Sequence, residues 1–270
     1  MIALRKKNMA GFTIVEMVTV IVLLSIITLG TTQFIGQGTS IYRDAITRDN
    51  LQQLGRFAIE RMSRELRNAL PGSIRTGING SVQCIEFVPI VAGSSYLQPV
   101  ADAAISSLNV VDFNYNYASG DQIAIATLDA ASVYSGGGTS NLTGASAAVN
   151  NQRTLTFAAK QFPQESTTGR FFIVTSPVSF CVDDVDDSLR RHSNYGIATG
   201  QAIPPAGGDL LAEHIQSVEE GGSPITLFNF NEGTAQRSAV VAMTLVFNDR
   251  GTLGIEWMRF SQEVFVRNTP

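Results

Sequence analysis

The hydrophobic pattern begins with one long apolar run. From Phe12 to Ile35 the chain has 24 residues, and Glu16 is the only charged one. As a helix this run measures about 36 Å, enough to cross a hydrocarbon core of about 30 Å. A buried core helix and a signal peptide are the alternatives, but a signal peptide is usually shorter and ends in small residues of A-x-A type. The run therefore predicts a membrane helix.

Basic residues lie on one side of this run only. Arg5, Lys6 and Lys7 precede it, and the next basic residue is Arg43. By the positive-inside rule, the N-terminus stays in the cytoplasm, and the part of the chain that follows the membrane helix lies on the opposite side of the membrane.

The segment from Ile41 to Leu70 is expected to continue the helix with an amphipathic pattern. Apolar residues recur at spacings of three and four, as on one face of a helix. They are Leu51, Leu54, Ala58, Met62, Leu66 and Ala69. Opposite charges stand four residues apart in two pairs, Glu60 with Arg64 and Arg61 with Glu65, each contributing a few tenths of a kcal/mol. Pro71-Gly72 ends the helix, and we expect its apolar face to contact the domain that follows.

After residue 72 the pattern becomes that of β-strands, rich in β-branched and aromatic residues. The expected strands are Val82–Val88, Gln122–Leu128, Arg153–Phe157, Arg170–Thr175, Val178–Val182, Thr226–Phe230, Ala239–Phe247, Thr252–Met258 and Glu263–Val266. Apolar side chains alternate on both sides of the turn sequence at 248–251, which predicts a hairpin. Residues 129–150 are small, polar and glycine-rich, so we expect a loop insertion there. The predicted fold class is α+β: a long N-terminal helix, part membrane and part amphipathic, packed on a C-terminal antiparallel β-sheet domain.

Charge argues against a nucleic-acid partner. The whole chain carries 19 basic and 23 acidic residues, and residues 71–270 carry 10 and 18. A domain that binds nucleic acid normally carries an excess of basic residues.

The search for catalytic chemistry is negative, and we expect no enzyme. His192 and His214 are the only histidines, and both stand in polar surroundings that favour a surface position. The sequence contains no G-x-S-x-G elbow, P-loop or H-E-x-x-H motif.

The two cysteines, Cys84 and Cys181, both fall in expected strands. If the domain lies in an oxidising compartment, an even pair indicates one disulfide. Two buried free thiols are the alternative.

One acidic cluster is a candidate metal-binding site. Asp183, Asp184, Asp186 and Asp187 place four carboxylates within five residues, and Ca²⁺ prefers such oxygen ligands. The spacing is not that of an EF-hand, and two arginines follow at once. A solvated turn is therefore the favoured interpretation, with calcium as the alternative and no other cofactor expected.

The carboxylate of Glu16 needs an explanation, because a charge in lipid costs at least a few kcal/mol. Its apolar run contains no basic partner. Cleavage between Gly11 and Phe12 would create one, a new α-amino group four residues before Glu16 on its own chain or on a neighbouring chain.

The stretch Gly11-Phe12-Thr13-Ile14-Val15-Glu16, preceded by Lys6 and Lys7, resembles the class III signal of type IV pilins and of type II secretion pseudopilins. The resemblance implies that a membrane peptidase cuts after Gly11 and methylates Phe12. It also implies that Glu16 neutralises the amino terminus of an adjacent subunit in a filament. One departure is Gln33, at a position where many major pilins have proline.

This resemblance implies a division of the chain into four parts. They are a leader at 1–11, a transmembrane and filament-core helix at 12–35, its amphipathic continuation at 36–70, and a periplasmic β-rich domain at 71–270. The expected partners are other major and minor pilins, the prepilin peptidase and methylase, the inner-membrane assembly platform and inner-membrane lipid. The expected location is the inner membrane, then the filament.

Three later segments resemble a smaller group within the type IV pilin family. Residues 55–75, 84–90 and 266–270 are similar to minor pilins of the mannose-sensitive haemagglutinin pilus, which implies a role in pilus assembly or initiation. The R-x-x-R-E-L-R helix at 61–67 is shared with J-type minor pseudopilins of type II secretion. A pilus-tip adhesin is a third expectation.

Overall fold

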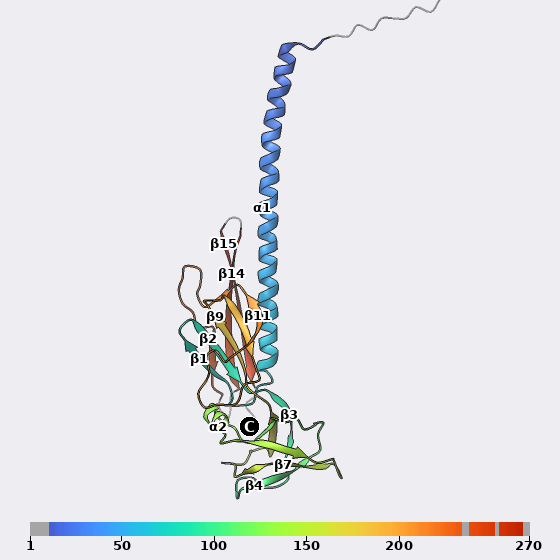
Figure 1. The fold of residues 1–270 in the computed structure, drawn as a ribbon, viewed down its shortest axis with the longest axis vertical. Helices are drawn as coiled ribbons and strands as arrows, with labels where there is room; N and C mark the ends of the chain where they lie inside the picture. Colours follow the sequence, from blue (N-terminus) through green and yellow to red (C-terminus); the bar gives the residue numbers. More distant parts are fainter. Residues whose placement is uncertain (1–10, 234–237, 252–253, 267–270) are drawn as a thin grey trace, which may run out of the picture.

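The computed structural model describes residues 11–233, 238–251 and 254–266. It begins with a single continuous helix, α1 (Ile14–Leu66), of 53 residues, about 80 Å long at 1.5 Å per residue. Thr13 caps it, because its hydroxyl accepts a hydrogen bond from the backbone N–H of Glu16 at 3.2 Å. The N-terminal half stands free, whereas the C-terminal half lies against the β domain (Figure 1).

Two antiparallel sheets lie beside the C-terminal half of α1. The first has the strand order β1-β2-β9-β10-β11, and the second places β12 and β13 on one side of β14 and β15 on the other. The strands of the first sheet are β1 (Arg75–Asn79), β2 (Val82–Phe87), β9 (Val178–Asp183), β10 (Ser188–His192) and β11 (Asp209–Glu213). Those of the second are β12 (Ile215–Gln216), β13 (Phe228–Asn231), β14 (Ala239–Arg250) and β15 (Ile255–Val266). We call these two sheets and the packed half of α1 the proximal unit.

The main core fills the space between α1 and these two sheets. The helix contributes the predicted stripe, of which Leu51, Ala58, Met62 and Leu66 are almost fully buried. Phe87 and Phe180 from the first sheet and Met243 and Phe247 from the second belong to the same cluster. Charged contacts at the rim hold the helix in place. Arg48 donates two hydrogen bonds to Glu256 of β15, and Arg191 of β10 pairs with Glu65 at 3.0 Å.

The remaining strands form a separate unit at the end farthest from the free half of α1 (Figure 1). Residues 88–177, which we call the distal unit, leave the proximal unit after β2 and return at β9. Its sheet has the order β3-β8-β5-β6-β7-β4, and Tyr96 pairs with Val110, so the first and last strands meet and close a small barrel. Its own apolar cluster fills the interior. The elements are β3 (Ile90–Ser95), β4 (Ile105–Val111), β5 (Gln122–Ala124), α2 (Ala130–Tyr134), β6 (Thr139–Ala145), β7 (Gln152–Lys160) and β8 (Arg170–Val174).

A buried polar contact fixes the distal unit to the proximal one. Glu86 of β2 is only 1% exposed, and Arg75 of β1 donates to it at 2.8 Å. The same guanidinium lies over the ring of Tyr134 in α2, 3.5 Å from its centroid. The Tyr134 hydroxyl donates to the backbone carbonyl of Ser73 at 2.9 Å. The paired guanidinium of Arg75, stacked on the ring of Tyr134, thus joins β1 of the proximal unit to α2 of the distal unit.

The α+β fold class is confirmed, as are the two helical ion pairs. The predicted strands differ from the observed ones at two places. Residues 129–150 are not one loop, because they contain α2 and β6. The sequence does not predict β6, because Leu142 is its only large apolar residue and the other buried positions, Thr139 and Ser140, are polar. The segments at 252–258 and 263–266 were predicted as two strands. They belong to one strand, β15, which pairs with β14 as far as Arg250. The turn therefore lies after 250, and residues 252–253 are outside the described residues.

Gly55 sets the distance between α1 and β15. A Cβ atom there would lie 2.1 Å from Cε2 of Phe260, whereas nothing lies within 4 Å of one at Gly38. We expect Gly55→Val to lower the free energy of unfolding by about 1–3 kcal/mol through overpacking. Denaturant unfolding of the full chain in detergent, followed by the fluorescence of Trp257, measures this. Gly38→Val is the matched control, and equal stability of the two variants would contradict the tight contact.

Candidate functional site

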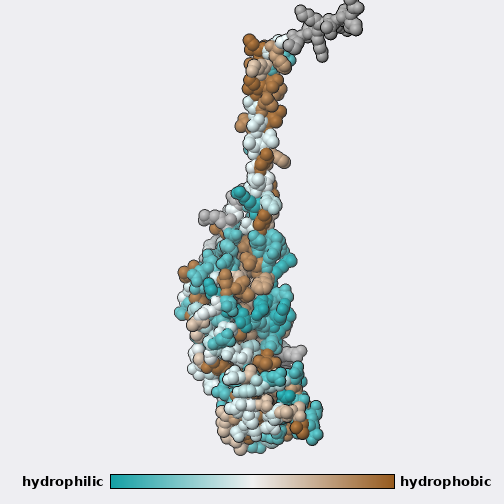
Figure 2. Space-filling model, turned by 45° about the vertical axis from the view of Figure 1, so that its right-hand side comes forward, coloured by the Kyte–Doolittle hydropathy of each residue, from teal (hydrophilic) through white to brown (hydrophobic). Residues whose placement is uncertain are grey.

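The predicted membrane helix is uncovered along its whole apolar half. All residues from 11 to 39 are exposed, and α1 is long and apolar enough to span a membrane. In Figure 2 this half protrudes from the body as a rod that is most hydrophobic near its free end. An apolar helix without cover in its own chain needs lipid or other helices around it.

The three residues at the start of this rod lie close together in space. Gly11 and Phe12 precede α1, and Phe12 is 81% exposed. Glu16 lies in the first turn of α1, where the helix dipole favours a negative charge. Within the described part of the chain, Glu16 forms no ion pair, so its carboxylate remains available to a group from outside.

The cysteine pair forms the predicted disulfide. Cys84 of β2 and Cys181 of β9 stand directly opposite each other in the antiparallel ladder, with a Cα–Cα distance of 4.1 Å. Both are buried. The bond lies at the neck where the distal unit leaves and rejoins the proximal unit, so it is a structural staple and not an accessible redox group.

The aspartate cluster lies in the turn between β9 and β10. Three of the four carboxylates accept hydrogen bonds that close this turn or attach it to neighbouring segments. These are Asp183 from Ser81, Asp184 from Ser217, and Asp187 from Gln216. Across the described ranges, no three His, Cys, Asp or Glu side chains are grouped so that they could hold a metal ion. These hydrogen bonds agree with the interpretation of the cluster as a turn.

The surface prediction for the histidines is wrong for His192. It ends strand β10, is only 2% exposed, and neither ring nitrogen has a hydrogen-bond partner among the described residues. The ring packs against Gly208, where a Cβ would lie 2.6 Å from it. Burial lowers the pKa of His192, and the backbone carbonyls of residues 205–207 offset part of this effect. The sequence gives little sign of this, because the segment that covers the ring lies well beyond it in the chain.

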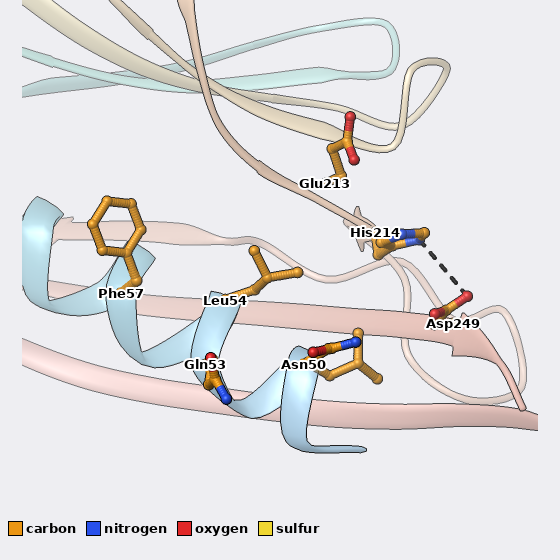
Figure 3. Close-up of a pocket in the computed structure, with 8 residues that line it drawn as sticks. Asn50, Gln53, Leu54, Phe57, Glu213, His214 and Asp249 are labelled. Carbon is orange, nitrogen blue, oxygen red and sulfur yellow. Dashed lines mark ion pairs between the residues drawn. The ribbon is translucent and has the colours of Figure 1, made fainter. Parts of the chain in front are cut away.

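His214 lines a groove beside α1 (Figure 3). The groove has a volume of about 410 Å³ and lies between the exposed side of the helix and the segment that joins β11 to β12. His214 Nδ1 faces Asp249 Oδ1 at 3.9 Å, too long for a hydrogen bond. The lining residues are Asn50, Leu51, Gln53, Leu54, Phe57, Glu213, His214 and Asp249. This lining includes neither serine nor cysteine, so the His–Asp pair has no nucleophile to activate. Phe57 is exposed at the edge of the groove.

Comparisons with known proteins add no family to this geometry. A scan against protein-family models gave no match, and searches of curated proteins and of solved structures gave none either.

The disulfide should contribute measurably to stability. It links positions 97 residues apart, and loop entropy predicts about 4–5 kcal/mol for a loop near this length, with measured values often lower. We expect the double variant Cys84→Ala/Cys181→Ala to unfold at lower denaturant concentration than the oxidised chain. Reductant should destabilise the wild type and leave the double variant unchanged. Two freely alkylated thiols in non-reducing peptide maps would refute the bond.

His192 should make stability fall on acidification. Its folded pKa lies below the ordinary value of 6.5, so below about pH 6.5 the unfolded chain binds a proton that the folded chain does not. The free energy of unfolding should then decrease as pH falls, by at most about 1.4 kcal/mol per pH unit, until the folded pKa is reached. His192→Gln should remove this component from unfolding curves taken between about pH 7 and pH 5. His214→Gln is the control and should keep it, whereas an unchanged slope in His192→Gln would contradict the assignment.

Proposed function

We propose that this chain is a minor pilin of a type IV pilus and takes part in pilus assembly or initiation through its N-terminal helix. The observation that supports this proposal most directly is the uncovered apolar half of α1. Its single charge is Glu16, near the exposed start of the helix. About half of this 53-residue helix is not buried by the chain itself. This half therefore requires lipid around it before assembly and other helices around it afterwards.

Glu16 supplies the specific part of this association. Apolar contact alone discriminates poorly between a neighbouring helix and lipid, because both are equally apolar. A carboxylate that meets the amino group of Phe12 on the adjacent subunit adds a charge pair, which in lipid stabilises one register over others. Cleavage after Gly11 would create this amino group, and the residues around the cut are exposed and precede the helix.

The rest of the assignment follows the sequence resemblance. The chain would stand in the inner membrane with its N-terminus in the cytoplasm and both β units in the periplasm, and then enter the filament. Its partners would be the prepilin peptidase and methylase, the assembly platform, and major and minor pilins. The segments at 55–75, 84–90 and 266–270 resemble minor pilins of the mannose-sensitive haemagglutinin pilus, in particular its biogenesis protein O.

A J-type minor pseudopilin is the second candidate, because the helix at 61–67 fits that family as well. A tip adhesin is the third, and the observation that favours it is the distal unit, which stands farthest from the membrane helix (Figure 1). Rescue of a pilus-deficient strain, compared with rescue of a secretion-deficient strain, separates the first two.

The proposal predicts the behaviour of Glu16→Gln. This variant keeps the shape of the side chain and removes the charge, and removing a charge from lipid should not hinder insertion. We expect it to be cut after Gly11 and to remain in the membrane, but to fail to restore piliation in a deletion strain. N-terminal mass spectrometry of membrane-extracted protein and electron microscopy of the cells give the two readouts.

Glu60→Gln is the matched control, because Glu60 is an exposed carboxylate on the same helix outside the apolar run. It should be processed and should restore pili. Normal assembly of Glu16→Gln would remove the charge-pair role. A mature chain that starts at Met1, or well beyond Phe12, would remove the pilin assignment itself.

A further inference from the structure

The segment that joins β10 to β11 crosses the face of the first sheet that points away from α1. It comprises residues 193–208, which we call the strap. Two side chains of β1 hold it: Arg75 donates to two of its carbonyls at 2.8 and 3.0 Å, and Asn79 donates to the carbonyl of Ile203 at 3.0 Å. None of residues 193–207 forms a backbone–backbone hydrogen bond with another described residue. A segment held in this way can open while the sheet beneath it stays folded.

The strap is the outer cover of the disulfide. Ile203 packs against a small cluster formed by Val82, Cys84 and Cys181. It lies close to β1, because a Cβ atom at Gly77 would be 2.4 Å from Cδ1 of Ile203. The two cysteines are 0% and 3% exposed. A reductant therefore reaches their bond only when the strap moves away or the whole domain unfolds.

His192 lies under the other end of the strap. It is 2% exposed, and neither ring nitrogen has a hydrogen-bond partner among the described residues. Gly208 covers the ring so closely that a Cβ atom there would be 2.6 Å from Cε1 of His192. The side-chain nitrogen of Gln201, also in the strap, is buried without a partner in the described structure. A neutral imidazole is tolerated in this position, whereas an imidazolium would bring a charge and two N–H donors into the same closed space.

Two charged groups of the sheet share this face with His192. Arg190 stands two residues before it on β10, and its positive charge disfavours a second one nearby. Glu86 of β2 lies in the same row, since one residue of β9 stands opposite both, but its carboxylate is already paired with Arg75 at 2.8 Å. Asp209 of β11 stands opposite the residue before His192, so it points to the other face. These neighbours therefore oppose a positive charge on His192 or leave it uncompensated.

The strap itself brings no ionised group to His192. It contains no Asp, Glu, Lys or Arg, and its one tyrosine, Tyr195, shares a hydrogen bond with the hydroxyl of Ser179. Burial raises the pKa of Tyr195, so the phenol stays neutral. The backbone carbonyls of residues 205–207 favour a protonated His192, but burial outweighs them and its pKa is lowered. The closed strap therefore accommodates the neutral ring better than the protonated one.

We propose that the strap is a pH-sensitive cover of the Cys84–Cys181 disulfide, closed over neutral His192 and opened locally when His192 is protonated. In the closed form the bond fixes the register of β2 and β9 and is out of reach of reductants. In the open form the same bond is exposed at the surface of the sheet, so acid makes it reducible. The inference uses only the first sheet and the strap, and it does not rest on the proposed filament role.

The size of the effect follows from proton linkage. A histidine that opening exposes has an ordinary pKa near 6.5, whereas His192 under the closed strap has a lower pKa. Below about pH 6.5 the open form therefore binds more protons, and the equilibrium constant for opening rises as pH falls. Between about pH 7.5 and pH 5.0 this rise is at most about 30-fold, the limit in which the closed form takes up no proton.

The rate at which a water-soluble phosphine reduces the disulfide measures this opening. The full chain in detergent is treated at about pH 7.5 and pH 5.0, and the released thiols are alkylated at intervals and counted by mass spectrometry. Because the phosphine itself reacts at a pH-dependent rate, each wild-type rate is divided by the rate of His192→Gln at the same pH. We expect this ratio to be between about threefold and 30-fold higher at the lower pH.

Three further variants serve as controls. His214→Gln removes the other histidine, which is exposed, and should keep the rise seen in the wild type. Asn79→Ala removes a hydrogen bond to the strap and leaves His192 in place, so it should speed reduction by about two- to tenfold at both pH values. If His192→Gln does not fold, His192→Phe replaces it, because a phenyl ring has a similar shape and does not titrate.

Urea below the unfolding transition separates local opening from global unfolding. Local opening exposes little surface, so the reduction rate should depend only weakly on urea, whereas global unfolding depends on it steeply.

Four results would overturn the proposal. The first is a ratio that is the same at both pH values, and the second is loss of the rise in His214→Gln. The third is an unchanged reduction rate in Asn79→Ala, which would mean that the strap does not limit access to the bond. The fourth is a reduction rate that increases with urea as steeply as global unfolding does.

Discussion

The pairing of β2 with β9 is the constraint on which the rest of the structure depends. These strands are adjacent in the five-stranded sheet although the 90 residues of the distal unit separate them in the chain. β2 is buried along its whole length, with one face against the α1 core and the other against the disulfide and Ile203. Because both strands also carry the start and end of the distal unit, their register determines where that unit sits. The disulfide between Cys84 and Cys181 holds this register.

The two ends of the molecule meet different surroundings, and their side chains differ accordingly. The free half of α1 is mainly apolar and carries one charge, Glu16, so it needs lipid or other helices around it. The distal unit at the opposite end is closed into a barrel with its own core, and its surface is mainly uncharged and polar. Most charges belong to the proximal unit and to α1, where pairs such as Arg48–Glu256 and Arg191–Glu65 attach the helix to the sheets.

Features with a short-range signal were predictable from the sequence. The helix was evident from its apolar run and its stripe, and the strands with β-branched or aromatic residues from their composition. Strands such as β6 and β10 could not be predicted, because each buries only one aliphatic side chain, Leu142 or Leu189, together with two polar residues. The cavity lined by Tyr117 and Asp121 could not be predicted either. Its lining comes from β5, β6, the end of β8 and the segment after β10, and nothing in the local sequence marks them as neighbours.

The sequence by itself determined the apolar span, the place of Glu16 within it, the α+β class and the even pair of cysteines. These follow from periodicity, composition and charge, which are local properties of the chain. Tertiary structure alone decided that the β region is two units, that His192 is buried, and that Asp121 is buried and accepts a hydrogen bond from Tyr115. Burial and hydrogen bonding depend on which distant segments cover a residue, and a strand's own residues do not specify that cover.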